Sequence, residues 1–201
     1  MTGVKNYISL IDSIKSLDKT ISVRQTSKPL LSSTIITSEF VDPKVIDSFI
    51  CTKNDIDINL CAIEYDHIMP YTRQVSVIPA VDRSVYWIGI IKTKNYYPHT
   101  FIRPEKLIDK LVNLFTLVDI KVPYKESFNS KYYVASDKTV KLISSLSDSI
   151  IDYLTELENI TLELKGNTCI YRLDNKPINE AQTKKYIDIG FRLTKKMQSG
   201  L

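Results

Sequence analysis

Residues 160–173, with the sequence ITLELKGNTCIYRL, indicate the class of fold most clearly. Apolar and polar residues alternate on both sides of Gly166-Asn167, as they do in strands with one buried face. A Gly-Asn pair between two alternating runs is typical of a two-residue hairpin, because glycine supplies the positive φ of a type II′ turn. The register that this turn sets brings Leu164 opposite Cys169, so apolar side chains meet on one face. We therefore predict a β-hairpin here.

The middle of the chain predicts further antiparallel strands. Residues 55–66 alternate, and a change of parity at Leu60-Cys61 indicates a β-bulge. Residues 71–79 also alternate and are expected to form a hairpin with residues 85–92, which are apolar on both faces like a covered central strand. Shorter strands are expected over residues 34–40 and around Phe128, Tyr132 and Val134, and residues 20–34 are expected to form either a connection or an edge strand.

Helical spacing of apolar residues predicts the remaining elements. The first is an amphipathic helix over residues 4–18. Prolines at the starts of three others suit the first turn of a helix, where a missing N–H costs nothing. The helices predicted after the first cover residues 43–51, 104–117, a stretch capped by Asp137, residues 147–157, and residues 177–198.

Length and composition bound the architecture. The chain has 201 residues and a mass of 23.1 kDa, with 43% apolar and 25% charged residues, which is the balance of an ordinary globular domain. We expect a single α+β domain spanning residues 1–201. Its sheet should be mostly antiparallel, with six or seven strands, and the helices, both terminal ones included, should pack mainly on one face.

Basic charge is concentrated at the end of the chain. The net charge is +4, and residues 184–196 account for all of it through Lys184, Lys185, Arg192, Lys195 and Lys196, against Asp188. We interpret this stretch as the solvated face of a helix. The alternative is that it binds an anionic membrane surface or an acidic partner. Lysines and tyrosines also alternate at two places, as in proteins that stack single-stranded bases. These residues are Lys92, Lys94, Tyr96 and Tyr97 at the first place, and Lys131, Tyr132 and Tyr133 at the second. Nucleic-acid binding is nevertheless disfavoured, because the body of the chain has no net positive charge.

The three cysteines predict no disulfide framework and no structural zinc site. Cys51, Cys61 and Cys169 are odd in number and include no CxxC pair, and the two histidines lack metal-ligand spacing. We expect reduced thiols in a cytoplasmic protein. No run of residues approaches the roughly 20 apolar residues of a membrane span, and no signal peptide opens the chain.

The common catalytic motifs do not occur. The sequence contains no GxGxxG, no P-loop, no HExxH and no GxSxG. An enzyme would need a composite site, in which Cys61 meets His67 or His99 as its base. Cys61 and His67 would lie about 20 Å apart along one strand, which disfavours that pair.

Carboxylates near the same strand offer a second set of reactive groups. Asp55 and Asp57 on one strand face, with Asp66 at its end, are paired carboxylates of the kind that perform acid–base work or hold a divalent metal. On a half-buried strand, they more simply mark the face that water contacts.

One segment resembles a known group of proteins. Pro98-x-x-Phe101-x-x-Pro104-Glu105, followed by Phe128-x-x-x-Tyr132-x-Val134 and Asp137, resembles a segment of uncharacterised bacterial proteins assigned to a domain of unknown function. The similar order of elements covers roughly residues 60–175. The resemblance implies an antiparallel sheet with a paired helical stretch and a late hairpin, and relatives that often carry membrane spans. It implies no catalytic, cofactor-binding or metal-binding residue.

The sequence therefore predicts a soluble, non-catalytic module that binds another protein or associates with itself. An enzyme with a composite cleft that uses Cys, His and Asp from separated segments is one alternative. A binder of nucleic acid or of anionic surfaces through the basic C-terminal helix is the other. No cofactor, metal or catalytic residue is predicted.

Overall fold

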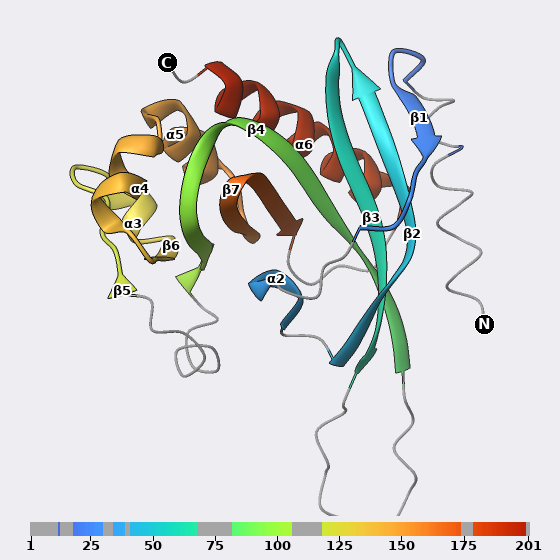
Figure 1. Ribbon diagram of the computed structural model, residues 1–201, viewed down its shortest axis with the longest axis horizontal. Helices are drawn as coiled ribbons and strands as arrows, with labels where there is room; N and C mark the ends of the chain where they lie inside the picture. Colours follow the sequence, from blue (N-terminus) through green and yellow to red (C-terminus); the bar gives the residue numbers. More distant parts are fainter. Residues whose placement is uncertain are drawn as a thin grey trace, which may run out of the picture.

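Antiparallel strand pairing organises the chain (Figure 1). The computed structural model describes Asp12 and residues 18–29, 34–38, 41–67, 82–105, 118–173 and 179–199. The strands within these ranges form one seven-stranded sheet, and every strand pair is antiparallel. They are β1 (Ser22–Gln25), β2 (Val41–Lys53), β3 (Ile56–His67), β4 (Asp82–Pro104), β5 (Val118–Asp119), β6 (Tyr132–Ser136) and β7 (Ile160–Leu173). The helices are α2 (Ile35–Ser38), α3 (Glu126–Asn129), α4 (Thr139–Ser145), α5 (Asp148–Glu156) and α6 (Glu180–Ser199).

Strand β4 is the spine of the sheet. It is 23 residues long and pairs β3 through its first part, β7 through its middle and end, and β6 at its end. Figure 1 shows β4 as a long arch, and β3, β6 and β7 are its neighbours in the sheet. The predicted α+β class with a mostly antiparallel sheet is thus confirmed, and residues 85–92 are central as expected.

The predicted hairpin over residues 160–173 is wrong, because β7 runs through Gly166 as one strand. Its whole length pairs β4, from Ile102 opposite Leu162 to Gly89 opposite Tyr171. Gly166 does adopt a positive φ of 61°, but it lies in a register shift rather than a turn. Such an irregularity also reverses the parity of the buried residues. A long partner strand therefore produces the same alternation that a local hairpin would show.

Other local predictions are also wrong. The predicted helix over 43–51 is part of β2, whose register is shifted near Pro43, as expected of proline within a sheet. The predicted strand over 34–40 contains α2 instead. β3 has no bulge at Leu60-Cys61, since its register to both neighbours continues across that point. Both faces of β3 are covered there, so both parities are apolar.

The helix predictions near the C-terminus are confirmed. Residues 148–156 form α5, with Ser147 as its N-cap, and residues 180–199 form α6. The stretch expected after Asp137 forms α4, but the predicted cap is wrong, because Lys138 occupies the N-cap position and makes no side-chain cap bond. Phe128 lies in α3 rather than in a strand, yet its ring stacks on Tyr132 at 5.2 Å between centroids. The predicted helix over 104–117 does not begin at Pro104, because Pro104 is the last residue of β4. The rest of that prediction beyond Glu105 lies outside the described residues, as do the predictions over 4–18, apart from Asp12 and Asp18, and over 71–79.

The two faces of the sheet are covered unequally. Side chains of α4, α5 and α6 share the main hydrophobic core with one face. The other face carries a small cluster in which Ile36 of α2 meets Ile63, Ile88 and Ile170. The described helices thus pack mainly on one side.

Tyr171 attaches α6 to the sheet. Its ring lies between Gly89 of β4 and Gly190 of α6, where a Cβ would come within 2.0 Å and 2.3 Å of Tyr171 atoms. Its hydroxyl donates to the carbonyl of Tyr186 at 3.0 Å, and the Tyr186 hydroxyl donates to the carbonyl of Trp87. The two glycines, which leave room for the Tyr171 ring, and these two hydrogen bonds fix the position of α6 on the sheet.

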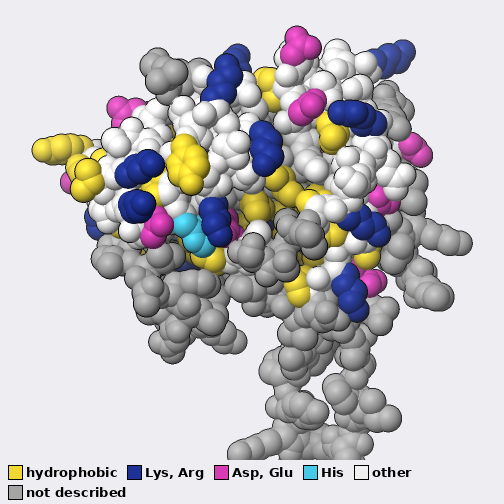
Figure 2. Space-filling view, viewed as in Figure 1, with side chains coloured by type: hydrophobic (Ala, Val, Ile, Leu, Met, Phe, Trp, Pro, Cys, Tyr) yellow, Lys and Arg dark blue, Asp and Glu magenta, His cyan; other side chains and the backbone are white. Residues whose placement is uncertain are grey.

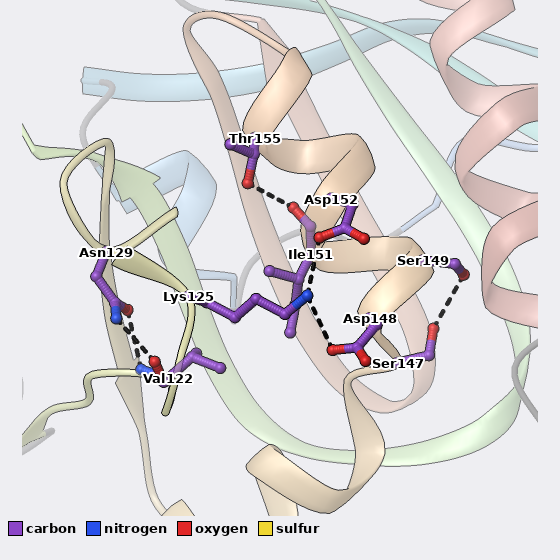
Figure 3. A network of polar contacts seen from close by, with 9 residues as sticks. All are labelled: Val122, Lys125, Asn129, Ser147, Asp148, Ser149, Ile151, Asp152 and Thr155. Carbon is purple, nitrogen blue, oxygen red and sulfur yellow. Dashed lines mark hydrogen bonds and ion pairs between the residues drawn. The ribbon is translucent and has the colours of Figure 1, made fainter. Parts of the chain in front are cut away.

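Polar contacts hold the turn before α3 (Figure 3). The Asn129 side chain accepts from the amide of Val122 at 2.9 Å and donates to its carbonyl at 2.8 Å. The Lys125 ammonium lies between Asp148 and Asp152 of α5, at 3.0 Å and 2.9 Å. The turn is therefore bonded both to Asn129 of α3 and to the two aspartates of α5.

Candidate functional site

A half-open groove of about 430 Å³ lies between the N-terminal half of α6 and the β1–β2 edge of the sheet. We call it the α6 groove. Its apolar lining comes from Ile21 before β1 and from Ile187 and Phe191 on α6. Lys184, Lys185 and Asp188 of α6 contribute charged groups, as do Asp18 and Lys53 on the opposite side. The groove thus combines an apolar floor with a charged rim.

Helical spacing explains how α6 lines this groove. Ile187 is buried at 2% exposure, whereas Lys184 and Asp188 on the neighbouring positions are exposed. Phe191 lies one turn after Ile187 on the same side of the helix, and it is half-buried against the core. One amphipathic helix therefore supplies both the floor and one rim.

The two carboxylates of the rim are already neutralised. Asp18 accepts from the Thr20 hydroxyl and from Lys53 at 3.1 Å, and these hydrogen bonds lower the pKa of Asp18 to about 2. Asp188 forms an ion pair with Arg192 at 2.9 Å. Both acidic groups of the groove thus have a basic partner beside them.

Two lysines of the rim have no such partner. Within the described ranges, neither Lys184 nor Lys185 forms an ion pair or a side-chain hydrogen bond, and both are exposed. Their charges are therefore available to a ligand. The groove can accept a group that is apolar on one side and anionic on the other.

The candidate base His99 meets a carboxylate rather than a thiol. Its Nε2 lies 2.8 Å from Oε1 of Glu163, a β7 residue with 2% of its side chain exposed. The second carboxylate oxygen accepts from the amide of Ile36 at 3.0 Å. A carboxylate that orients an imidazole is one part of many acid–base sites. No cysteine takes part in it.

The three cysteines are core residues. Cys51, Cys61 and Cys169 are free thiols with 0% exposure. Burial raises the pKa of Cys61 to about 11 and raises the pKa of Cys169 well above its usual range. A nucleophilic thiol needs the opposite shift, so this environment disfavours the thiolate. Cys61 contacts Ser48 and Asn59, each at 3.5 Å.

The carboxylate set of the sequence does not form on one strand face. Asp55 lies in the β2–β3 turn with a φ of 60°, while Asp57 accepts from the Thr52 hydroxyl across the hairpin. The side chains of Asp66 and His67 lie outside the described residues. Within the residues that are described, no three His, Cys, Asp or Glu side chains are close enough to hold a metal ion.

The tyrosines divide into buried and exposed ones. Tyr97 and Tyr132 belong to the core, at 0% and 2% exposure, and Tyr133 lies under the Arg103 guanidinium at 4.9 Å. Tyr96 is 69% exposed. Of the aromatic residues that the sequence associated with nucleic acid, Tyr96 alone projects from the surface to this extent.

Sequence reasoning missed Glu163, Asp18 and Lys53. Glu163 occupies a polar position of an alternating run, a pattern that predicts exposure. Asp18 and Lys53 are 35 residues apart and meet only because β1 pairs β2. No local signal in the sequence indicates either contact.

No protein-family model, no curated protein and no solved structure matches the chain. The resemblance to a bacterial domain of unknown function therefore remains a prediction. Among the described helices, none is long and apolar enough to cross a membrane.

Proposed function

We propose that this chain is a non-catalytic, cytoplasmic binding module whose α6 groove docks an acidic, apolar segment of another protein. The observation that carries the proposal is the pairing of charges around the groove. Asp18 and Asp188 are neutralised by Lys53 and Arg192, while Lys184 and Lys185 have no partner among the residues that the structure describes. The surplus is positive, so the complementary ligand is negative.

The apolar floor determines the rest of the ligand. Ile21, Ile187 and Phe191 form a continuous apolar lining, which is the kind of surface that apolar anchors of a peptide fill. A segment that alternates Asp or Glu with Leu or Phe places anchors on this floor and carboxylates beside the two lysines. A simple anion would leave the floor unused.

The environment of the thiols supports a non-catalytic role. The pKa of Cys61 is raised to about 11 by burial, which suits a core residue better than a nucleophile. The His99–Glu163 pair is engaged in holding the α2 amide of Ile36. Both sets of groups therefore have a structural use.

Selection from a random peptide display library on the immobilised full chain tests the proposal. We expect enrichment of peptides that combine acidic and apolar residues. The affinity of the chain for a labelled selected peptide should fall at least tenfold when Lys184 and Lys185 are both changed to Glu, because the reversed charges repel the carboxylates of the peptide.

Lys195→Glu is the matched control. It makes the same change on an exposed residue of α6 outside the groove, so affinity should stay near that of the unchanged chain. Enrichment of basic peptides, no enrichment at all, or equal loss in both variants would each contradict the proposal.

A further inference from the structure

Strand β4 carries a wide bulge opposite a single residue of β7. Between the pairs Lys92–Thr168 and Tyr97–Gly166, β4 has four residues where β7 has one. The Thr93 hydroxyl donates to the carbonyl of Asn95 at 2.8 Å and closes the bulge. Bulges redirect side chains and are common beside functional sites. This one leaves the ring of Tyr96 69% exposed.

Lysines from three segments lie next to Tyr96 in sequence, across the strand pair or in contact with its ring. Lys94 lies on the bulge itself, and Lys165 precedes Gly166, whose added Cβ would lie 3.5 Å from the Tyr96 ring. From α4, the Lys141 ammonium lies 4.9 Å from the ring centroid. Figure 2 shows Lys and Arg side chains gathered over β4, β7 and α4, at the left of the view. We call these residues, together with Lys92 and Lys138, the Tyr96 surface.

The charge of the Tyr96 surface is not neutralised. Within the described residues, none of its five lysines forms an ion pair; Lys92 instead donates to the Thr168 hydroxyl at 3.0 Å. The nearby carboxylate of Glu163 is buried and bonded to His99. Asp137 is an exposed acidic residue next to His99, since its backbone amide donates to the carbonyl of His99. The local excess of positive charge is therefore strong, although the net charge of the whole chain is small.

We propose that the Tyr96 surface binds single-stranded nucleic acid. One unstacked base lies on the Tyr96 ring, and the phosphates on either side of it contact the lysines. Base-on-aromatic stacking with a surrounding cationic groove is the usual chemistry of such sites. Lys141 covers the ring in the free protein and moves to a phosphate when the base stacks.

The single protruding ring favours this ligand over other polyanions. A lipid headgroup and heparin carry charge without a planar base, so neither gains from Tyr96. The Tyr96 surface shares no residue with the α6 groove.

Fluorescence anisotropy with a labelled oligothymidylate of about twelve nucleotides tests the inference on the full chain. We expect binding whose log K falls linearly with log salt concentration. Tyr96→Ala should weaken it about tenfold or more, while Tyr96→Phe, which keeps the ring, should bind as the unchanged chain does. Lys141→Gln with Lys165→Gln should lower the salt slope by about 1.4, since each phosphate contact on a single strand contributes about 0.7.

Two comparisons separate this site from general charge attraction. Lys184→Glu with Lys185→Glu, on the other basic surface, should leave the oligonucleotide affinity within about twofold. Heparin and phosphatidylserine vesicles should bind Tyr96→Ala as well as they bind the unchanged chain. No oligonucleotide binding at low salt, equal binding by Tyr96→Ala, or Tyr96-dependent binding of vesicles instead of the oligonucleotide would each overturn the inference.

Discussion

His99 and Glu163 are hydrogen-bonded across the β4–β7 pair, with 2.8 Å between Nε2 and Oε1, although 64 residues separate them in sequence. They are diagonal neighbours, because Glu163 lies opposite Phe101, two residues beyond His99. The other oxygen of Glu163 accepts from the amide of Ile36. One buried carboxylate of β7 is thus bonded to both β4 and α2.

Glu163→Gln should destabilise the fold by about 1–3 kcal/mol, because a neutral amide oxygen is a weaker acceptor for the Ile36 N–H than a carboxylate. The amide can bond His99 only by donating to its Nε2, which requires the imidazole proton on Nδ1. Urea unfolding measures the loss, and hydrogen exchange at the Ile36 amide should accelerate. Glu158→Gln is the control, since Glu158 is exposed. Unchanged exchange at Ile36 in Glu163→Gln would show that this bond does not hold α2.

Gly190→Ala should destabilise the protein by about 1–3 kcal/mol through overpacking. The added Cβ would lie 2.3 Å from the Tyr171 hydroxyl oxygen, so α6 must shift from the sheet. Combining it with Tyr171→Phe removes the obstructing hydroxyl, and the double variant should be more stable than the sum of the two single losses predicts. A double-mutant cycle from thermal or urea unfolding measures this coupling. Strict additivity would place the strain elsewhere.

Asn129→Ala should cost about 1–3 kcal/mol, because it leaves the amide and carbonyl of the buried Val122 without their partner. Lys125→Met should cost less than about 1 kcal/mol, since its partners Asp148 and Asp152 are 81% and 64% exposed. Unfolding at low and high salt measures the loss of stability in each variant. Only the loss from Lys125→Met should shrink as the salt concentration rises, because salt screens the ion pairs that this variant removes. A larger loss from Lys125→Met would reverse the ranking.

The three thiols should react with Ellman's reagent only as fast as the chain unfolds. With a pKa of about 11, Cys61 is ~0.1% thiolate at pH 8, and all three side chains are buried. Because folding raises the pKa of Cys61 from its usual 9 to about 11, the stability linked to its protonated form is complete below about pH 9. That stability is lost as the pH rises toward 11.

Stopped-flow labelling in native buffer, with a denatured sample as reference for three thiols per chain, measures this rate. A fast phase of one thiol in native buffer would contradict the burial and revive a reactive cysteine.

Local signals predicted those elements whose residues decide their own conformation. The periodic apolar stretch over residues 147–157 predicted α5, and the amphipathic run after Pro177 predicted α6, because helical spacing is a property of neighbouring residues. The burial of the three thiols fits the behaviour of cysteine without a redox or metal motif, which is that of a small apolar residue. The α+β class followed from these periods.

Long-range pairing decided the rest. Residues 160–173 satisfy a hairpin locally, yet β4 offers a partner along their whole length, and Gly166 serves a bulge instead of a turn. Pairing with β4 also moved Glu163 to a buried position and brought Tyr96 and Lys165 together from distant segments. Alternation by itself determined that strands and amphipathic helices would form. Only the tertiary structure decided which strand each one pairs with, because hydrogen bonding and burial across the sheet outweigh the preference of any single turn.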